Sequence, residues 1–172
     1  MKEDNYNFKW SDIGDVQIGR PNLGSNTNVA VYRLMQYTMR SVLNKEYGAI
    51  KAAELFYNSG YIAGKEFCRN LLDVKLEFYD FISQLQKVLK ELNVGILRIE
   101  KSDLEKMNFT FTVAEDLDCS GLPITDETVC DYDEGFIAGV FFEYTKQNFT
   151  VKEIDCWSSG DRICRFTVKS EE

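Results

Sequence analysis

The chain has 172 residues, of which 44% are hydrophobic and only two are proline, as is typical of one globular domain with a buried core. Its 28 acidic and 20 basic residues give a net charge of −8, and no run of Lys or Arg stands out, so we expect no direct binding to nucleic acid. The chain contains no histidine, which excludes a Ser-His-Asp or Cys-His nucleophile and a histidine-ligated haem.

The sequence indicates a cytoplasmic protein that does not enter a membrane. No apolar signal segment follows Met1, and no stretch approaches 18 uninterrupted apolar residues. The five cysteines are an odd number, which in a chain without a secretory signal favours a reducing compartment.

The first 28 residues are rich in Gly, Asn and Ser, which predicts an irregular lead-in with a short strand at residues 16–18. Residues 29–172 are then expected to form a single domain. Helical spacing of apolar residues predicts three helices, over about 28–47, 50–72 and 75–92. The apolar residues that share one face of the first helix are Val31, Leu34, Met35 and Val42.

From Gly95 onward the apolar period changes to two, which predicts strands around residues 97–99 and 109–113. After a loop containing Cys119, a fourth helix is expected over about 131–147, followed by a β-hairpin. Helices followed by strands around one more helix predict an α+β fold, in which N-terminal helices pack on an antiparallel sheet.

The pattern Gly-aromatic-Ile-Ala-Gly occurs twice, at residues 60–64 and 135–139, on two separate predicted helices. Glycine inside a helix costs about 1 kcal/mol relative to alanine. Two such pairs therefore indicate either a close approach of two helices or room left for a ligand.

Cys130, Glu153, Cys156 and Cys164 are spaced as ligands of one metal ion, and thiolates suit a structural zinc. If Gly160 is central in the hairpin loop, Cys156 lies directly opposite Cys164, with Cβ atoms roughly 5 Å apart. Three aspartates near these ligands are either hydrogen-bond acceptors for them or solvated surface residues: Asp131, Asp133 and Asp155.

The position of Glu153, three residues before Cys156, puts the two side chains on opposite faces of a flat strand. A bulge or bend is needed to bring both to the metal. Otherwise Cys119 or a water molecule takes the fourth position. Two other interpretations are a disulfide between Cys156 and Cys164, and free thiols buried in the core.

Three segments, TVCDYDEGFIAG (128–139), KEIDCW (152–157) and GDRICRF (160–166), resemble the 4-vinyl reductase domain family. The resemblance is sharp over residues 115–169. That family includes aromatic-effector sensor domains of bacterial transcriptional activators, and its wider fold is similar to that of TRAPP subunits. The resemblance implies a bound zinc held by the matching residues, Cys130, Glu153, Cys156 and Cys164.

Our leading hypothesis is a binding or sensing domain for a small apolar or aromatic molecule, with a structural zinc. Four protein ligands leave no open position on the zinc for a catalytic water, which argues against an enzyme. One alternative, implied by the family name, is a tetrapyrrole vinyl reductase or carrier, although Gly-x-Gly is absent and with it the dinucleotide fingerprint. The other is a structural dimerisation module without a ligand. Related domains often pair, so we expect a homodimer.

Overall fold

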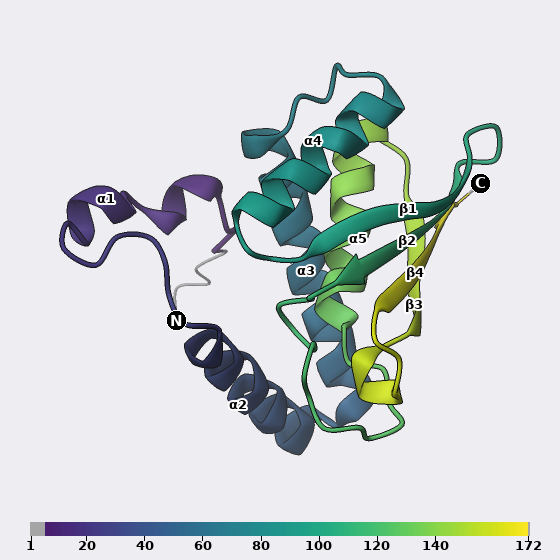
Figure 1. Cartoon of the computed structure of the whole chain (residues 1–172). Coiled ribbons are helices and arrows are strands. Elements are labelled where there is room, and N and C mark those ends of the chain that lie inside the picture. The colour runs from purple at the N-terminus through teal and green to yellow at the C-terminus, as the bar shows by residue number, and fades with distance from the viewer. Residues whose placement is uncertain (1–5, 172) are drawn as a thin grey trace.

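The computed structural model describes residues 6–171, and Figure 1 shows how the elements are arranged. Two short elements, the 3-10 helix η1 (Trp10–Ile13) and the helix α1 (Val16–Gly19), come first. The longer helices are α2 (Val29–Tyr47), α3 (Ala49–Leu71), α4 (Phe78–Glu91) and α5 (Asp131–Thr145). The strands are β1 (Ile96–Asp103), β2 (Asn108–Ala114), β3 (Phe149–Asp155) and β4 (Cys164–Ser170), with the 3-10 helix η2 (Trp157–Ser159) between the last two.

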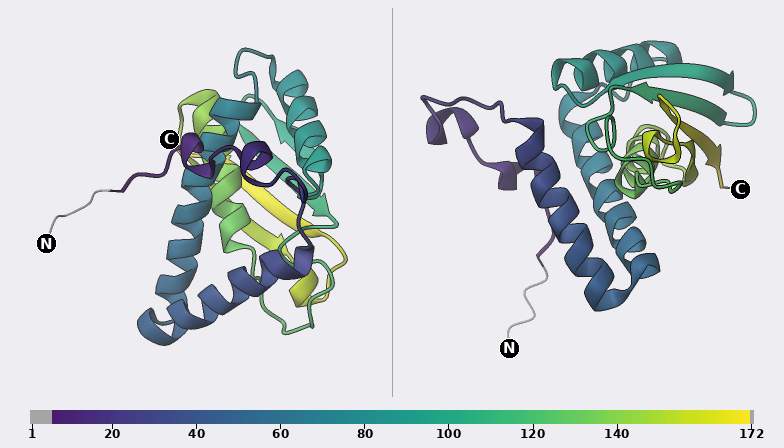
Figure 2. Two further views of the ribbon diagram at one scale, coloured as in Figure 1. Left: turned by 90° about the vertical axis from the view of Figure 1, so that its left-hand side faces the viewer. Right: turned by 60° about the horizontal axis from the view of Figure 1, so that its bottom comes forward.

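The four strands form one antiparallel sheet in the order β1-β2-β4-β3. Phe111 of β2 lies opposite Phe166 of β4, and both side chains are fully buried. Helix α5 packs against β3 and also against α3, while α4 packs against β1 (Figure 2). The predicted α+β class is therefore confirmed, with N-terminal helices, an antiparallel sheet, a later helix and a C-terminal hairpin.

Local signals explain where the helices begin and end. The Asn28 side chain accepts a hydrogen bond of 2.8 Å from the amide of Ala30 at the start of α2. Gly48, with φ of 83°, separates α2 from α3. The predicted strand at residues 16–18 is wrong: this segment is α1, because the Asp15 side chain caps the amide of Ile18 and starts a helical turn.

The two repeated glycine pairs lie where α3 and α5 cross. Gly60 and Gly64 on α3 face α5, and Gly135 and Gly139 on α5 face α3. A Cβ atom at any of the four would collide with a backbone oxygen of the facing helix. The close-approach interpretation is therefore confirmed, and the missing side chains let the two backbones touch.

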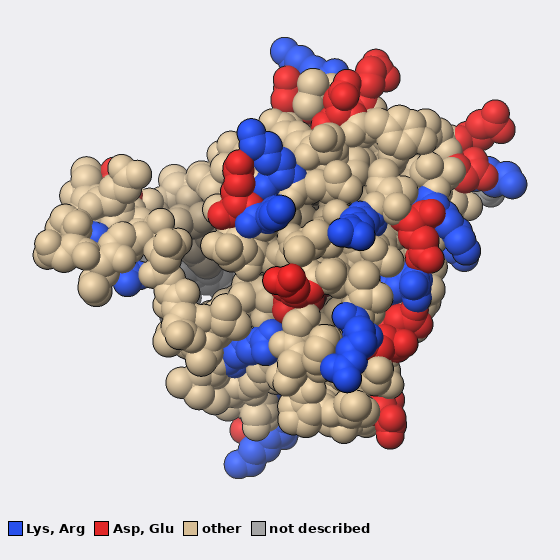
Figure 3. All heavy atoms as spheres, viewed as in Figure 1, with Lys and Arg blue, Asp and Glu red and all other residues tan. Residues whose placement is uncertain are grey.

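Helix α2 presents its apolar side chains to solvent, and Gln36 is its buried residue. Figure 2 shows α2 leaning away from the body of the domain, and in Figure 3 its visible surface is largely uncharged. The exposed fractions of the apolar residues are 59% for Val31, 67% for Leu34, 64% for Met35, 52% for Met39 and 56% for Val42. A polar contact surface, described below, holds this helix in place.

Candidate metal centre

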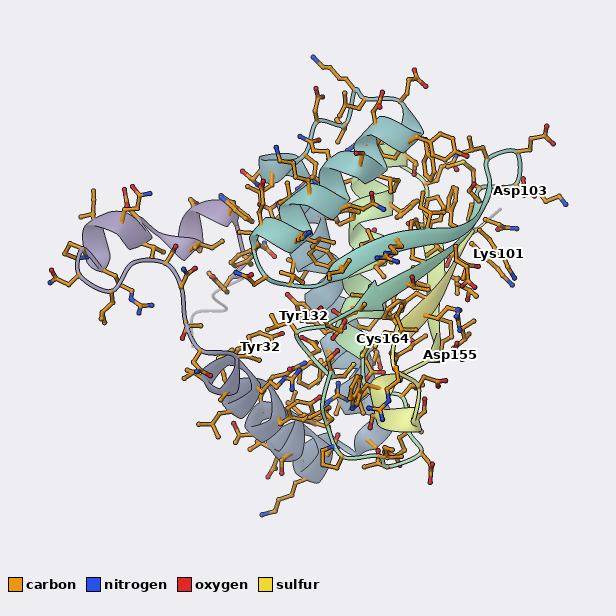
Figure 4. All side chains as sticks on the ribbon, viewed as in Figure 1. Tyr32, Lys101, Asp103, Tyr132, Asp155 and Cys164 are labelled. Atoms are coloured by element: carbon orange, nitrogen blue, oxygen red, sulfur yellow. The ribbon has the colours of Figure 1, made fainter. Side chains whose placement is uncertain are left out.

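Four cysteine side chains meet at one end of the sheet; we call them the cysteine centre. Cys119 lies in the loop between β2 and α5, Cys130 directly precedes α5, Cys156 follows β3 and Cys164 begins β4. Each is at most 1% exposed. Figure 4 shows Cys164 at this end of the sheet, on the same side of the domain as Tyr132 and Tyr32.

The four sulfur atoms lie within 4.8 Å of one another. Cys119 Sγ is 3.0 Å from Cys164 Sγ, and Cys130 Sγ is 3.9 Å from Cys156 Sγ and 4.0 Å from Cys164 Sγ. A tetrahedral zinc with Zn–S bonds of about 2.3 Å needs S–S edges of about 3.8 Å. The two Cys130 distances match that edge, and a small separation of Cys119 from Cys164 would complete it. All five cysteines of the chain are free thiols in this structure.

The pKa values of the clustered thiols move in opposite directions. Contacts from the other three thiols lower the pKa of Cys156 far below the usual value, whereas the corresponding contacts raise the pKa of Cys130. One thiolate is thus easily accommodated, and each further one requires a compensating positive charge. The donor set therefore suits a thiophilic cation such as zinc.

A bulge in β3 directs both Glu153 and Cys156 inward, as the sequence required for both to approach one site. Glu153 lies opposite Phe166, but Asp155, two residues later, lies opposite Arg165, so Ile154 is the extra residue. Ile154 points to solvent, while Glu153 and Cys156 are buried.

Glu153 contacts the cysteine centre without being one of the four clustered side chains. Its Oε2 atom accepts a hydrogen bond of 3.2 Å from the amide of Cys130, and its buried Oε1 atom has no hydrogen-bond partner among the described residues. Burial, and then the nearby Cys156 sulfur, raise the pKa of Glu153 to about 8. The Glu153 amide donates to Glu134, which also pairs with Lys152.

Asp116 folds the loop that brings Cys119 inward. One of its carboxylate oxygens accepts hydrogen bonds from the amides of Asp118, at 2.8 Å, and Cys119, at 3.1 Å. Burial, and then the charge of Asp118, raise the pKa of Asp116 to about 7. Sequence reasoning missed both aspartates, although an Asp two or three residues before the amides it accepts is a recognisable turn signal.

Helix α2 is tied to this same loop. Asp118 accepts hydrogen bonds from Tyr32, at 2.7 Å, and from Gln36, at 2.6 Å. Arg33 donates to the carbonyl oxygen of Leu117 at 2.7 Å. The polar side of α2 therefore faces the cysteine centre, which explains why its apolar side faces solvent.

Of the three aspartates that the sequence places near the ligands, two form ion pairs elsewhere. Asp131 pairs with Arg40, and Asp155 pairs with Arg165. Asp133 is the one that approaches the cysteine centre, and burial raises its pKa well above the usual value.

An apolar cavity of about 40 Å³, the core cavity, lies between the sheet, α4 and α5. Its two polar lining residues, Asp116 and Asp133, connect it with the cysteine centre. The apolar lining residues are Leu85, Leu89, Val94, Gly95, Leu97, Phe111, Val113, Phe136, Ile137, Val140 and Phe141.

The described residues contain no helix that is both long enough and apolar enough to span a membrane.

Comparison with known proteins confirms the family resemblance. The model of the vinyl-4-reductase domain matches residues 109–170, the part that contains all four clustered cysteines. An uncharacterized protein of Methanocaldococcus jannaschii is 26% identical over 147 residues, covering 86% of this chain and 80% of the relative. Another from the same organism is 33% identical over 107 residues, which are 58% of this chain but only 55% of that relative.

Solved structures share the fold at low sequence identity. The phenol-responsive sensory domain of the transcription activator PoxR, solved with phenol, has a TM-score of 0.65 and 15% identity, covering 84% of this chain and 75% of that chain. A vinyl-4-reductase family protein from M. jannaschii has a TM-score of 0.63 and 19% identity, covering 98% and 99%. A trafficking protein particle complex subunit 3 from Naegleria fowleri, bound to palmitic acid, has a TM-score of 0.67 and 14% identity, covering 84% and 96%. These proteins are similar in fold.

Proposed function

We propose that this domain binds and senses a small apolar or aromatic molecule in the core cavity, beside a structural zinc. The core cavity carries the proposal, because an apolar cavity with a few converging polar groups is the usual form of a small-molecule site. The likeness to a phenol-responsive sensory domain supports it. A reducing cytoplasm would keep the thiols available for metal.

For the zinc, we propose Cys130, Cys156 and Cys164 as ligands, as the sequence predicts, with Cys119 as the fourth. The mutual distances of the four sulfurs support this set over one containing Glu153. Glu153 then supports the site by accepting the amide hydrogen of Cys130. Four thiolates complete a tetrahedral zinc, so its role is to hold β3, β4, α5 and the Cys119 loop together.

The core cavity must enlarge to admit a ring, since cavities that bind benzene are on the order of 150 Å³. Phe136 and Ile137, which are half-buried on α5, are the lining residues best placed to rotate outward. We therefore expect ligand binding to be coupled to a small repacking of α5.

Ligand binding is tested by thermal unfolding of zinc-loaded protein with phenol, p-cresol or toluene. At about 100 times its dissociation constant a ligand stabilises the folded state by about 2.7 kcal/mol, which raises Tm measurably. Val140→Phe, which fills the core cavity, is expected to remove that shift. The exposed control Val74→Phe is expected to keep it. Absence of any shift in the natural protein, or an equal shift in Val140→Phe, argues against this cavity as the site.

We also propose that a second copy of the chain covers the apolar side of α2. The exposed stripe repeats at helical spacing along the whole helix, so two α2 helices related by a two-fold axis can bury it against each other. The polar side of α2 is already occupied by its contacts with Asp118 and Leu117.

Replacing Leu34 with Glu is expected to convert the dimer into a monomer, because a charge would be buried at the centre of the stripe. Sedimentation equilibrium measures the mass, and Lys45→Glu, at the end of α2, is the control charge change. A natural protein that sediments as a monomer at high micromolar concentration contradicts the proposal.

A further inference from the structure

A second possible metal-binding group shares one residue with the cysteine centre. The ligand atoms of Asp116, Cys130 and Asp133 lie within 4.8 Å of one another, and Cys130 belongs to both groups. Asp133 lies in the first turn of α5, whereas Asp116 comes from the loop after β2. Two segments distant in the sequence thus bring their carboxylates to the same thiol.

One carboxylate oxygen of this group lacks a partner. The Oδ2 atom of Asp133 is inaccessible to solvent and has no hydrogen-bond partner in the described part of the chain, although Asp133 lines the core cavity. Asp116 is only 5% exposed, and its described side-chain hydrogen bonds are the two it accepts from backbone amides. A buried carboxylate oxygen without a donor is costly unless a cation or a proton satisfies it.

Charge leads to the same conclusion. A zinc ion held by four thiolates has a net charge of −2, so it offers no positive charge to two adjacent carboxylates. Arg33 contacts the backbone oxygen of Asp116 and not its carboxylate. None of the ion pairs among residues 6–171 involves Asp116 or Asp133.

We propose that Asp116, Asp133 and the thiolate of Cys130 bind a second divalent transition-metal ion, with Cys130 bridging the two metals. Two carboxylates and one thiolate suit a borderline ion such as zinc or iron(II). Three protein ligands leave a coordination position for water or for a ligand, on the side of the core cavity that Asp116 and Asp133 line. This inference rests on the proposed zinc at the cysteine centre, because Cys130 must be held as a thiolate.

Equilibrium dialysis against excess Zn²⁺, followed by elemental analysis, counts the ions bound to the full chain. We expect two zinc ions per chain in the natural protein and one in Asp133→Asn, in which the affinity for the second ion falls at least about tenfold. Asp131→Asn removes the same charge from the same turn of α5, outside the proposed site, and is expected to retain two. Circular dichroism on each variant confirms that it is folded.

The outcomes separate this inference from the proposed zinc centre. One zinc per chain in the natural protein overturns the second site and leaves the cysteine centre intact. Two ions in both the natural protein and Asp133→Asn overturn the assignment to Asp133. No bound zinc overturns both the second site and the cysteine centre.

Discussion

Replacing Cys119 with serine is expected to lower the affinity for zinc by more than about 100-fold. Loss of residues that only support metal ligands costs about 10–100-fold, and loss of a ligand should cost more. A 100-fold loss corresponds to about 2.7 kcal/mol of stability when zinc is present. Competition with a chromophoric chelator measures the affinity, and thermal unfolding with and without zinc measures the stability.

Two variants make this prediction specific. Cys68→Ser replaces a fully buried cysteine of α3 outside the cysteine centre, so its zinc affinity should equal that of the natural protein. Glu153→Gln should retain one zinc per chain at saturating metal, with affinity lowered by about 10–100-fold. If Glu153→Gln loses the metal and Cys119→Ser keeps it, Glu153 is the fourth ligand.

Replacing Gly135 with alanine is expected to destabilise the domain by about 3 kcal/mol or more, an effect at the upper end of those seen on overpacking. The added methyl group would collide with the backbone oxygen of Tyr57 on α3, so one helix must move as a whole. In a domain of this size, that loss lowers Tm by about 10 °C. Differential scanning calorimetry measures it directly.

A matched control separates the helix crossing from helix propensity. Asn58→Ala, on the exposed side of α3, also introduces alanine and should leave stability unchanged or slightly higher. If Gly135→Ala is as stable as the natural protein, the two helices do not approach as closely as described.

Sequence periodicity predicted the four long helices well because their apolar residues repeat over many turns. The predicted boundaries at residues 28–47 and 131–147 lie within two residues of those of α2 and α5. The segment at residues 16–18 was wrongly predicted, because three residues carry no period and a single cap at Asp15 decides their structure. The stripe on α2 was recognised, but periodicity alone does not show whether a stripe meets the core or another molecule.

Part of the metal centre was also predictable. The hairpin places Cys156 and Cys164 together by register, and the need for a bulge after Glu153 follows from the two-residue period of a strand. The position of Cys119 was not predictable, because it depends on hydrogen bonds of Asp116 within an irregular loop. Sequence reasoning therefore offered Cys119 as an alternative to Glu153 without deciding between them.

X-ray absorption spectroscopy at the zinc K-edge, on protein loaded with one zinc per chain, tests the cysteine centre most directly. Our account predicts four sulfur ligands at about 2.3 Å. Three sulfurs and one oxygen or nitrogen at about 2.0–2.2 Å would contradict the assignment of Cys119 as the fourth ligand.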